Sequence, residues 1–348
     1  MTGRHDEQAT QRPLVTVLGA SGFVGAAVTR EFARRPVRLR LVSRSRAVVP
    51  RDAVADIEVR TGDLTEEAVL TDAVEGSDVV IHLLAYMSAG ANWRGAGSAA
   101  ERVNVGTMRR LTEILRPAPD GRPVTVIYAG TASQVGLSAT TRVDGSEPDE
   151  PQSSYDRQKL TAQRVLEAAT RAGHVHGFTL RLPTVIGCVP GRVGSKGVVA
   201  AMIGRALAGE PITMWHDGSV RRDLLHVEDV ARAFTAAVDH GHELVGRHWM
   251  IGSGRGEPLG AVFDRVAKLV SVRTGEAPVQ VLTVPSPEYA ELGDFHSMEI
   301  DSSAFRGVTG WLPRLTLEEG LERTVDDLHR QARSAPAVAD SAGGSGDD

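Results

Sequence analysis

The chain has 348 residues, of which 41% are hydrophobic and 24% are charged, a balance typical of a globular protein with a buried core. No apolar run approaches the ~18 residues of a membrane-spanning helix, and the first residues lack the apolar segment of a secretory signal. We therefore expect a cytoplasmic protein that does not bind membranes. The net charge of −5 gives no electrostatic footprint for nucleic acid, and the single cysteine, Cys188, cannot form a disulfide within the chain.

Short apolar segments alternate with helical stretches through the first half of the chain. Runs rich in Val, Ile and Leu predict strands at 14–19, 38–43, 57–63, 78–85, 124–130 and 176–183. Strands of this kind are buried on both faces, which predicts an α/β fold with a Rossmann-type doubly wound parallel sheet. Residues 1–12 and 331–348 are polar and rich in small side chains, so we expect both ends to be disordered.

The regular alternation fades after Gly187, which indicates a second, smaller and irregular α/β domain. Apolar patterning returns at 224–238 and 248–254, so the chain is expected to revisit the sheet there. We predict a dinucleotide-binding domain over 13–187, with return segments in the region 223–254. A discontinuous substrate domain is expected over 188–222 and 255–330.

A glycine-rich turn follows the first expected strand and precedes a helical stretch. Glycines at this spacing permit a tight turn and a close approach of the backbone to a pyrophosphate, which then faces the N-terminus of the helix. We therefore expect a dinucleotide cofactor to bind at Gly19, Ser21, Gly22, Phe23, Val24 and Gly25.

The second expected strand ends in Ser43-Arg44-Ser45-Arg46, where an NAD-binding chain usually has an Asp or Glu. Hydroxyls and a guanidinium suit the 2′-phosphate of NADP(H), which a carboxylate would repel, so we predict that Ser43 and Arg44 bind NADP(H). The alternative is that Arg44 belongs to an arginine-rich surface.

Asp63 and Leu64 follow the third expected strand, where they are placed to meet the adenine. Asp63 is also suited to cap the next helix, and the two roles are compatible.

Tyr155 and Lys159 lie four residues apart on a helix expected over 153–172, so their side chains share a face. A cation beside a phenol favours the phenolate and lowers its pKa, which would fit Tyr155 for acid–base catalysis. The alternative is a surface pair without chemistry.

The glycine turn and Tyr155-x-x-x-Lys159 together resemble the extended short-chain dehydrogenase/reductase family, which comprises sugar-nucleotide epimerases, dehydratases and reductases. The likeness covers about 14–328 and extends to four further stretches, at 80–85, 103–105, 221–230 and 309–313. The resemblance implies that the cofactor also contacts Leu83, Leu84, Ala85, Asn104, Tyr155, Lys159 and Pro183.

In the family, a catalytic Ser or Thr lies five residues before the glycine of a Val-Tyr-Gly ending. Counting back from Gly136 gives Thr131, and Ser133 is the alternative because the tyrosine of that ending is absent here. The resemblance thus implies that Thr131, Tyr155 and Lys159 are catalytic. Dehydratases of the family continue from this threonine with Asp-Glu, whereas Ala132-Ser133 follows here, so dehydration is not expected.

Within the family, stretches 197–203 and 214–218 resemble the actinomycete dTDP-4-keto-6-deoxyhexose 4-ketoreductases of antibiotic deoxysugar biosynthesis. This likeness implies NADPH-dependent reduction of the C4 ketone of a dTDP-4-keto-6-deoxyhexose. An NAD-dependent sugar-nucleotide 4-epimerase is the alternative, and a non-catalytic sensor of NADP(H) is a third reading.

The resemblance also implies that the dTDP moiety binds on the second domain, with Arg222 on the diphosphate. Further residues expected to bind substrate are Tyr86, Thr184, Arg192, Lys196 and Trp215. The eleven histidines show no metal-ligand spacing, so no metal site is expected. Helices near 101–115 and 155–172 resemble those through which family members form homodimers. The acidic loop 144–150 is expected to be solvated, with a lid over the site as the alternative.

Overall fold

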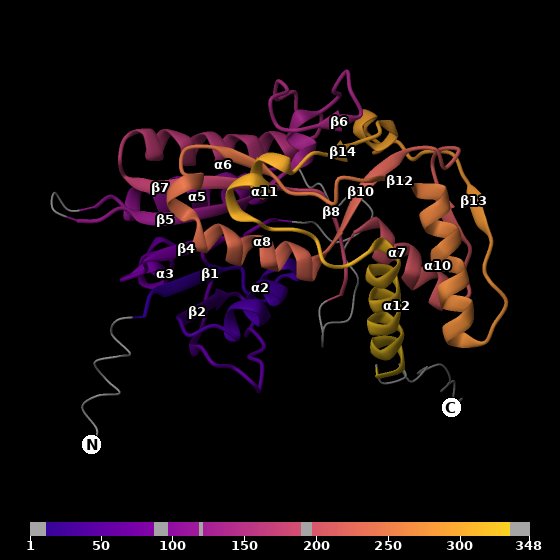
Figure 1. Ribbon diagram of the computed structural model, residues 1–348, viewed down its shortest axis with the longest axis horizontal. Helices are drawn as coiled ribbons and strands as arrows, with labels where there is room; N and C mark the ends of the chain where they lie inside the picture. The colour runs from indigo at the N-terminus through magenta and orange to yellow at the C-terminus, as the bar shows by residue number, and fades with distance from the viewer. Residues whose placement is uncertain (1–11, 87–96, 118–120, 189–196, 335–348) are drawn as a thin grey trace, which may run out of the picture.

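Seven parallel strands form the main sheet, which we describe in a computed structural model covering residues 12–86, 97–117, 121–188 and 197–334 (Figure 1). Their order across the sheet is β11-β7-β5-β4-β1-β2-β3, and each neighbouring pair is parallel. The predicted Rossmann-type α/β fold is confirmed, and all six expected strands belong to this sheet. Their bounds are β1 (Leu14–Leu18), β2 (Arg38–Ser43), β3 (Asp56–Thr61), β4 (Val79–His82), β5 (Val124–Thr131), β7 (Val175–Leu182) and β11 (His248–Met250).

The strand order reverses between β1 and β4. From β1 the chain adds β2 and β3 on one side, then crosses to place β4 and β5 on the other. The register sets Leu18 of β1 beside both Val42 and His82, so three strands end close together at this reversal. In open parallel sheets, ligands bind at the carboxyl edge at such a point.

Helices cover both faces of the sheet because alternate residues of each strand point to opposite sides. Val15 and Val17 pack with Phe32 of α2 (Phe23–Ala33) and Phe234 of α8 (Val227–Asp239). Leu18 belongs to the core on the other face. The helices contributing to that core are α3 (Glu67–Val74), α5 (Thr107–Ile114) and α6 (Ser154–Arg171).

A third hydrophobic core lies among α7 (Val198–Leu207), α10 (Leu259–Thr274) and α12 (Leu317–Ser334). Figure 1 shows these helices grouped at one end of the molecule, away from the large sheet. Their buried side chains include Ile203, Phe263 and Val325. The grouping is compatible with a separate substrate domain, whose boundaries stay a prediction.

Small sheets and short helices connect these parts. One sheet has the order β12-β10-β8, and two further pairs are β13-β9 and β14-β6. The strands are β6 (Arg142–Val143), β8 (Thr184–Ile186), β9 (Ile212–Met214), β10 (Arg221–His226), β12 (Gly256–Pro258), β13 (Val281–Thr283) and β14 (Glu299–Ile300). The short helices are α4 (Ser98–Glu101), a π-helix (Arg102–Gly106), α9 (Gly241–Leu244), α11 (Ser303–Thr309) and two 3₁₀ helices, η2 (Ala132–Val135) and η3 (Leu292–Phe295).

The apolar patterning at 224–254 meets the large sheet in two places, because α8 packs on the sheet and β11 joins it beside β7. Strand β10 pairs instead with β8 and β12. The disorder expected at 331–334 is wrong, since α12 continues to Ser334. Residues 1–11 and 335–348 lie outside the described ranges.

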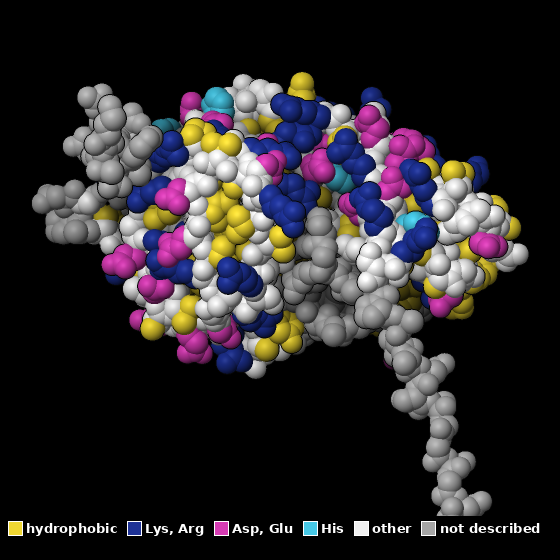
Figure 2. All heavy atoms as spheres, turned by 90° about the horizontal axis from the view of Figure 1, so that it is seen from below, with side chains coloured by type: hydrophobic (Ala, Val, Ile, Leu, Met, Phe, Trp, Pro, Cys, Tyr) yellow, Lys and Arg dark blue, Asp and Glu magenta, His cyan; other side chains and the backbone are white. Residues whose placement is uncertain are grey.

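Two properties of the described residues concern the expectations about membranes and nucleic acid. Within the described ranges, no helix is both long and apolar enough to cross a bilayer. Basic and acidic side chains are interspersed over the face drawn in Figure 2.

Candidate active site

The glycine turn joins β1 to α2 at the carboxyl edge of the sheet. Gly19 has a φ of +92°, which strains any residue with a side chain. A Cβ on Gly25 would lie 2.1 Å from the Gly19 carbonyl oxygen, so only glycine lets the helix start this close to the turn. Gly22 is the N-cap, no side chain caps the helix, and its first turn carries no acidic residue. This helix end fits the pyrophosphate of a dinucleotide.

The end of β2 carries the residues expected to select the cofactor. The buried Ser43 hydroxyl accepts a hydrogen bond from the Ser21 N–H (3.2 Å) and donates one to the Ser45 carbonyl (2.8 Å). The accepted bond ties the glycine turn to β2, and the hydroxyl proton is used within the segment after β2. Arg44 is exposed, and its binding of a 2′-phosphate stays a prediction.

Asp63 makes local contacts after β3. Its carboxylate accepts from the Thr65 N–H (2.9 Å) and hydroxyl (2.8 Å), which lower its pKa, and the charges of Arg44 and Arg102 lower it further. Asp63 thus stabilises the turn before α3. Leu64 is buried in the core, so its side chain does not line a surface site. Arg102 was missed from the sequence because nothing in its spacing places it near β3.

The segment after β4 lies against the glycine turn. Leu83 N–H donates to the Leu18 carbonyl (2.9 Å), and a Cβ on Gly19 would lie 3.3 Å from the Leu83 backbone. Ala85, which follows, is exposed. Contact of this backbone with a cofactor stays a prediction.

Asn104 is almost fully buried, and both ends of its amide are bound within the protein. Its Oδ1 accepts from the Tyr86 N–H and its Nδ2 donates to Gln158 Oε1, both at 2.7 Å. Asn104 therefore positions the chain after β4 against α6. Its direct contact with a cofactor stays a prediction.

Lys159 reaches from α6 to the ends of two strands. Its Nζ donates to the Ala129 carbonyl (2.9 Å) and the Leu84 carbonyl (3.4 Å), and it lies 5.8 Å from the centre of the Tyr155 ring. Burial lowers the pKa of Lys159 to about 7. The predicted Tyr–Lys pair is therefore placed at the carboxyl edge of the sheet.

The expectation that Lys159 lowers the pKa of Tyr155 is wrong for this structure. Burial raises the pKa of Tyr155, and the neighbouring Asp156 carboxylate raises it further. The Lys159 ammonium lies closer to the ring of Tyr128 (4.8 Å) than to that of Tyr155. A phenol in this environment keeps its proton at neutral pH, which suits a proton donor better than a base.

Thr131 ends β5 and is the N-cap of η2. Its Oγ1 lies 2.8 Å from the Ser133 Oγ, so the structure brings both candidate hydroxyls together. Ser133 in turn donates to Asp156 Oδ1 at 2.5 Å. Asp156 was missed from the sequence because the spacing Ser153-x-x-Asp156 indicates only a helix cap. Its contact with Ser133 is not visible in the sequence.

His82 and Tyr128 lie beneath the Tyr–Lys pair. Their rings meet edge to face at 5.4 Å, and His82 Nε2 is 3.0 Å from Thr107 Oγ1. Burial, and then the Lys159 charge, lower the pKa of His82 to about 3. His82 is therefore neutral in the folded protein and supports Lys159 without competing for a proton.

Arg222 makes contacts that differ from those expected of a diphosphate-binding residue. Its guanidinium donates to the backbone carbonyls of Gly293 (2.8 Å), Asp294 (2.9 Å) and His296 (2.5 Å). It therefore holds the segment around η3. A diphosphate at Arg222 would replace some of these bonds.

The other expected substrate residues are dispersed. The ring centres of Trp215 and Tyr289 lie 5.8 Å apart, edge to face. Thr184, on β8, pairs with Leu224 of β10. Pro183, expected at the cofactor, joins β7 to β8. Arg192 and Lys196 lie outside the described residues.

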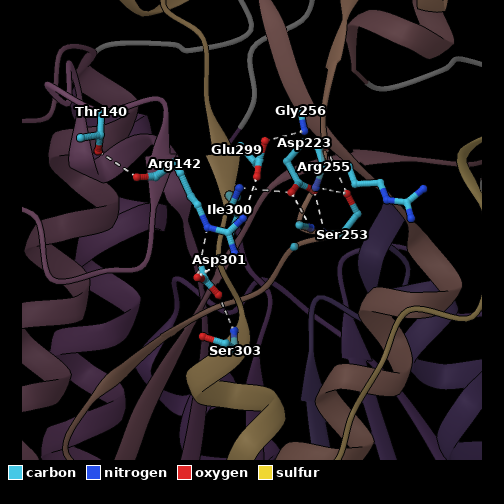
Figure 3. Close-up of polar contacts among 12 residues, drawn as sticks. Thr140, Arg142, Asp223, Ser253, Arg255, Gly256, Glu299, Ile300, Asp301 and Ser303 are labelled. Carbon is cyan, nitrogen blue, oxygen red and sulfur yellow. Dashed lines mark hydrogen bonds and ion pairs between the residues drawn. The ribbon is translucent and has the colours of Figure 1, made fainter.

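Asp223 is a buried carboxylate beside Arg222 that sequence reasoning did not single out. It accepts from the N–H groups of Ser253 (2.8 Å), Gly254 (3.0 Å) and Ile300 (3.2 Å), as Figure 3 shows. Burial raises its pKa. Asp223 joins β10, which carries Arg222, to the chain after β11 and to β14. In the part of the chain that the structure describes, no cluster of three or more His, Cys, Asp or Glu could hold a metal.

Residues 15–252 match the sequence profile described as the NAD dependent epimerase/dehydratase family. The chain is 27% identical over 343 residues to dTDP-6-deoxy-L-talose 4-dehydrogenase (NAD(P)(+)) of Kitasatospora kifunensis, an alignment covering 97% of this chain and 100% of that protein. It is 26% identical over 350 residues to dTDP-L-rhamnose 4-epimerase of Burkholderia thailandensis, covering 88% and 92%. A solved structure, MoeE5 in complex with UDP-glucose and NAD, is similar with a TM-score of 0.76 and 25% identity, covering 92% of this chain and 99% of that one.

Proposed function

Since the chain belongs to the NAD dependent epimerase/dehydratase family, we propose that it reduces the C4 ketone of a dTDP-4-keto-6-deoxyhexose with NADPH. The observation that carries the proposal is the grouping of Thr131, Tyr155 and Lys159 at the ends of β4 and β5, with no carboxylate directly after Thr131. Two relatives named as acting on dTDP-6-deoxysugars at C4 support the substrate class. A role in antibiotic deoxysugar biosynthesis is part of the proposal and rests on resemblance alone.

Tyr155 is the proton donor in this proposal. The cofactor, when bound, supplies the hydride to C4, and Tyr155 gives its proton to the carbonyl oxygen. The raised pKa keeps that proton in place until the oxygen becomes basic. Thr131 contacts the sugar beside this oxygen and fixes the orientation of the ketone.

Lys159 holds the cofactor in place. An ammonium has three donors, and the Ala129 and Leu84 carbonyls use two of them, so one is left for the nicotinamide ribose.

The preference for NADPH rests on the basic, carboxylate-free end of β2. Arg44 is exposed there, and Arg102 contributes a second positive charge nearby. A 2′-phosphate would be attracted by both guanidinium groups. An enzyme that only reduces its substrate must release the oxidised cofactor and bind a reduced one in every cycle, and NADPH suits this exchange.

An NAD-dependent sugar-nucleotide 4-epimerase is the second candidate, supported by the 26% identity to dTDP-L-rhamnose 4-epimerase. Tyr155 would first take the proton of the C4 hydroxyl while bound NAD would accept the C4 hydride, and both would then be returned with the hydride on the other face. A non-catalytic sensor of NADP(H) would have no use for all three residues of the catalytic set.

The remaining assignments complete the proposal. Substrate would be bound by Arg222, with Tyr86, Thr184, Arg192, Lys196 and Trp215 as further candidates. Homodimerisation through α5 and α6 also stays a prediction, and sedimentation velocity would test it.

The proposal is tested by following NADPH absorbance with dTDP-4-keto-6-deoxyglucose generated in place, with NADH in parallel and a sugar-free control. A 3,5-epimerase is added to half of the samples to supply the L-series ketone. We expect oxidation of NADPH that requires the sugar. No oxidation, together with NAD that stays bound through purification, would favour the epimerase instead.

A further inference from the structure

A chain of hydrogen bonds runs from Thr131 to a carboxylate that the proposed mechanism does not use. Thr131 Oγ1 lies 2.8 Å from Ser133 Oγ, Ser133 Oγ lies 2.5 Å from Asp156 Oδ1, and Ser153 Oγ lies 2.6 Å from Asp156 Oδ2. Asp156 is 7% exposed and Ser153 is fully buried, so little water competes for these groups. Asp156 directly follows Tyr155, which brings the carboxylate of α6 to the end of β5.

The direction of each bond follows from counting hydrogens. A serine or threonine hydroxyl has one proton and can accept two hydrogen bonds, whereas a carboxylate only accepts. Ser133 gives its proton to Asp156, so the proton between Thr131 and Ser133 must come from Thr131. Ser133 N–H also donates to Thr131 Oγ1 at 3.4 Å. Thr131 is left with one lone pair and no proton for a further partner.

We propose that Asp156 is a positioning residue that acts through Ser133 to make Thr131 a hydrogen-bond acceptor toward the substrate. This inference rests on the proposed function, because it assigns the ligand of Thr131 to the sugar being reduced. A ketone oxygen also only accepts, so it gains no hydrogen bond from a Thr131 held in this way. A sugar hydroxyl can donate to it. Thr131 therefore favours the alcohol over the ketone, and Tyr155 alone donates to the ketone oxygen.

The arrangement also explains why the position after Ala132 holds a serine. Ser133 is short enough to bridge Thr131 to Asp156, and its own proton is committed to the carboxylate. Asp156 has a local role as well, because Ser153 caps α6 by accepting from the Asp156 N–H at 2.9 Å. The test must separate this cap from the chain of hydroxyls.

The experiment measures sugar binding in complexes that cannot react. Calorimetry gives the Kd of dTDP-4-keto-6-deoxyglucose with NADP⁺ present, and the Kd of its own alcohol product with NADPH present. Ser133→Ala frees the Thr131 proton for the ketone, so we expect the ketone-to-alcohol Kd ratio to fall about fivefold, the effect of about one neutral hydrogen bond. Asp156→Asn, whose amide can donate to Ser133, should change the ratio in the same direction.

Two controls separate this role from a structural one. Ser153→Ala removes the helix cap and the other bond to Asp156, and it should leave the ratio unchanged. In a Thr131→Val background, Ser133→Ala should have no further effect on the ratio, because the group on which it acts is gone.

An unchanged ratio in Ser133→Ala, with both sugars still bound, would overturn the inference and leave the proposed function intact. A shift of the ratio in Ser153→Ala as large as that in Ser133→Ala would also overturn the inference and leave the proposed function intact. Wild-type protein that binds neither sugar would overturn the proposed function, and the inference with it. Should Asp156→Asn fail to fold, Ser133→Ala alone decides.

Discussion

Buried Arg181 and half-buried Asp149 form an ion pair that fixes the acidic loop 144–150 to the large sheet. Arg181 is 0% exposed, and its Nη1 and Nη2 lie 2.7 and 2.9 Å from the two carboxylate oxygens of Asp149. Its Nε donates to Gln163 Oε1 (3.0 Å), which also accepts from Gln134 Nε2. Asp149 therefore anchors the loop, whereas Asp144, Ser146, Pro148 and Glu150 are exposed, as expected of a solvated loop.

Asp149→Asn should destabilise the protein by about 3–5 kcal/mol, because it leaves the Arg181 charge buried without its partner. Urea unfolding followed by circular dichroism measures the loss. Glu150→Gln makes the same change of charge at an exposed position of the same loop and should fall within about 0.5 kcal/mol of wild type. Equal stability of the two variants would contradict the role of the pair.

Tyr155→Phe should lower kcat about 10²–10⁴-fold, because it removes the proposed proton donor and little else. Affinity for NADPH, measured by fluorescence titration, should stay close to that of wild type. Near-normal turnover in this variant would exclude Tyr155 as the donor.

Arg44→Ala should raise the KM for NADPH about tenfold or more and leave the KM for NADH unchanged, since only NADPH carries the 2′-phosphate. Arg51→Ala removes the same charge from another exposed position and serves as the matched control. If both variants raised the KM for NADPH equally, general surface charge would account for the effect, and Arg44 would lose its assigned role.

Lys159 should make stability depend on pH. Its pKa is lowered to about 7 in the folded protein, whereas an unfolded lysine keeps its proton to about pH 10.4. Between these values the unfolded chain binds more protons, so the free energy of unfolding gains a contribution that rises with pH. The difference between wild type and Lys159→Met, measured without cofactor by urea unfolding, should therefore increase from pH 7 to about pH 9. A difference that stays flat would show that the folded and unfolded chains hold this proton equally.

The sequence predicted those features that depend on local pattern. Apolar runs such as 14–19 and 38–43 identified the strands, and the four-residue spacing of Tyr155 and Lys159 placed both on one face of α6. The glycine turn was found for the same reason, because its φ of +92° at Gly19 is a local requirement.

Features that depend on packing were not predicted. Ser133 meets Asp156 across 23 positions of sequence, and Asp149 meets Arg181 across 32, so neither contact leaves a local signal. The direction of the Tyr155 pKa shift was also wrong, because burial is a property of the folded chain and raises this pKa.

The most direct test of the proposed function follows a labelled hydride. NADPH carrying deuterium at C4 of the nicotinamide, on the transferred face, is incubated with the enzyme and dTDP-4-keto-6-deoxyglucose, and the sugar is analysed by NMR. Our account predicts one deuterium at C4 of the product sugar for each NADPH oxidised. Recovery of the unreduced ketone, with the deuterium still on the NADPH, would contradict it, because no hydride would have reached C4.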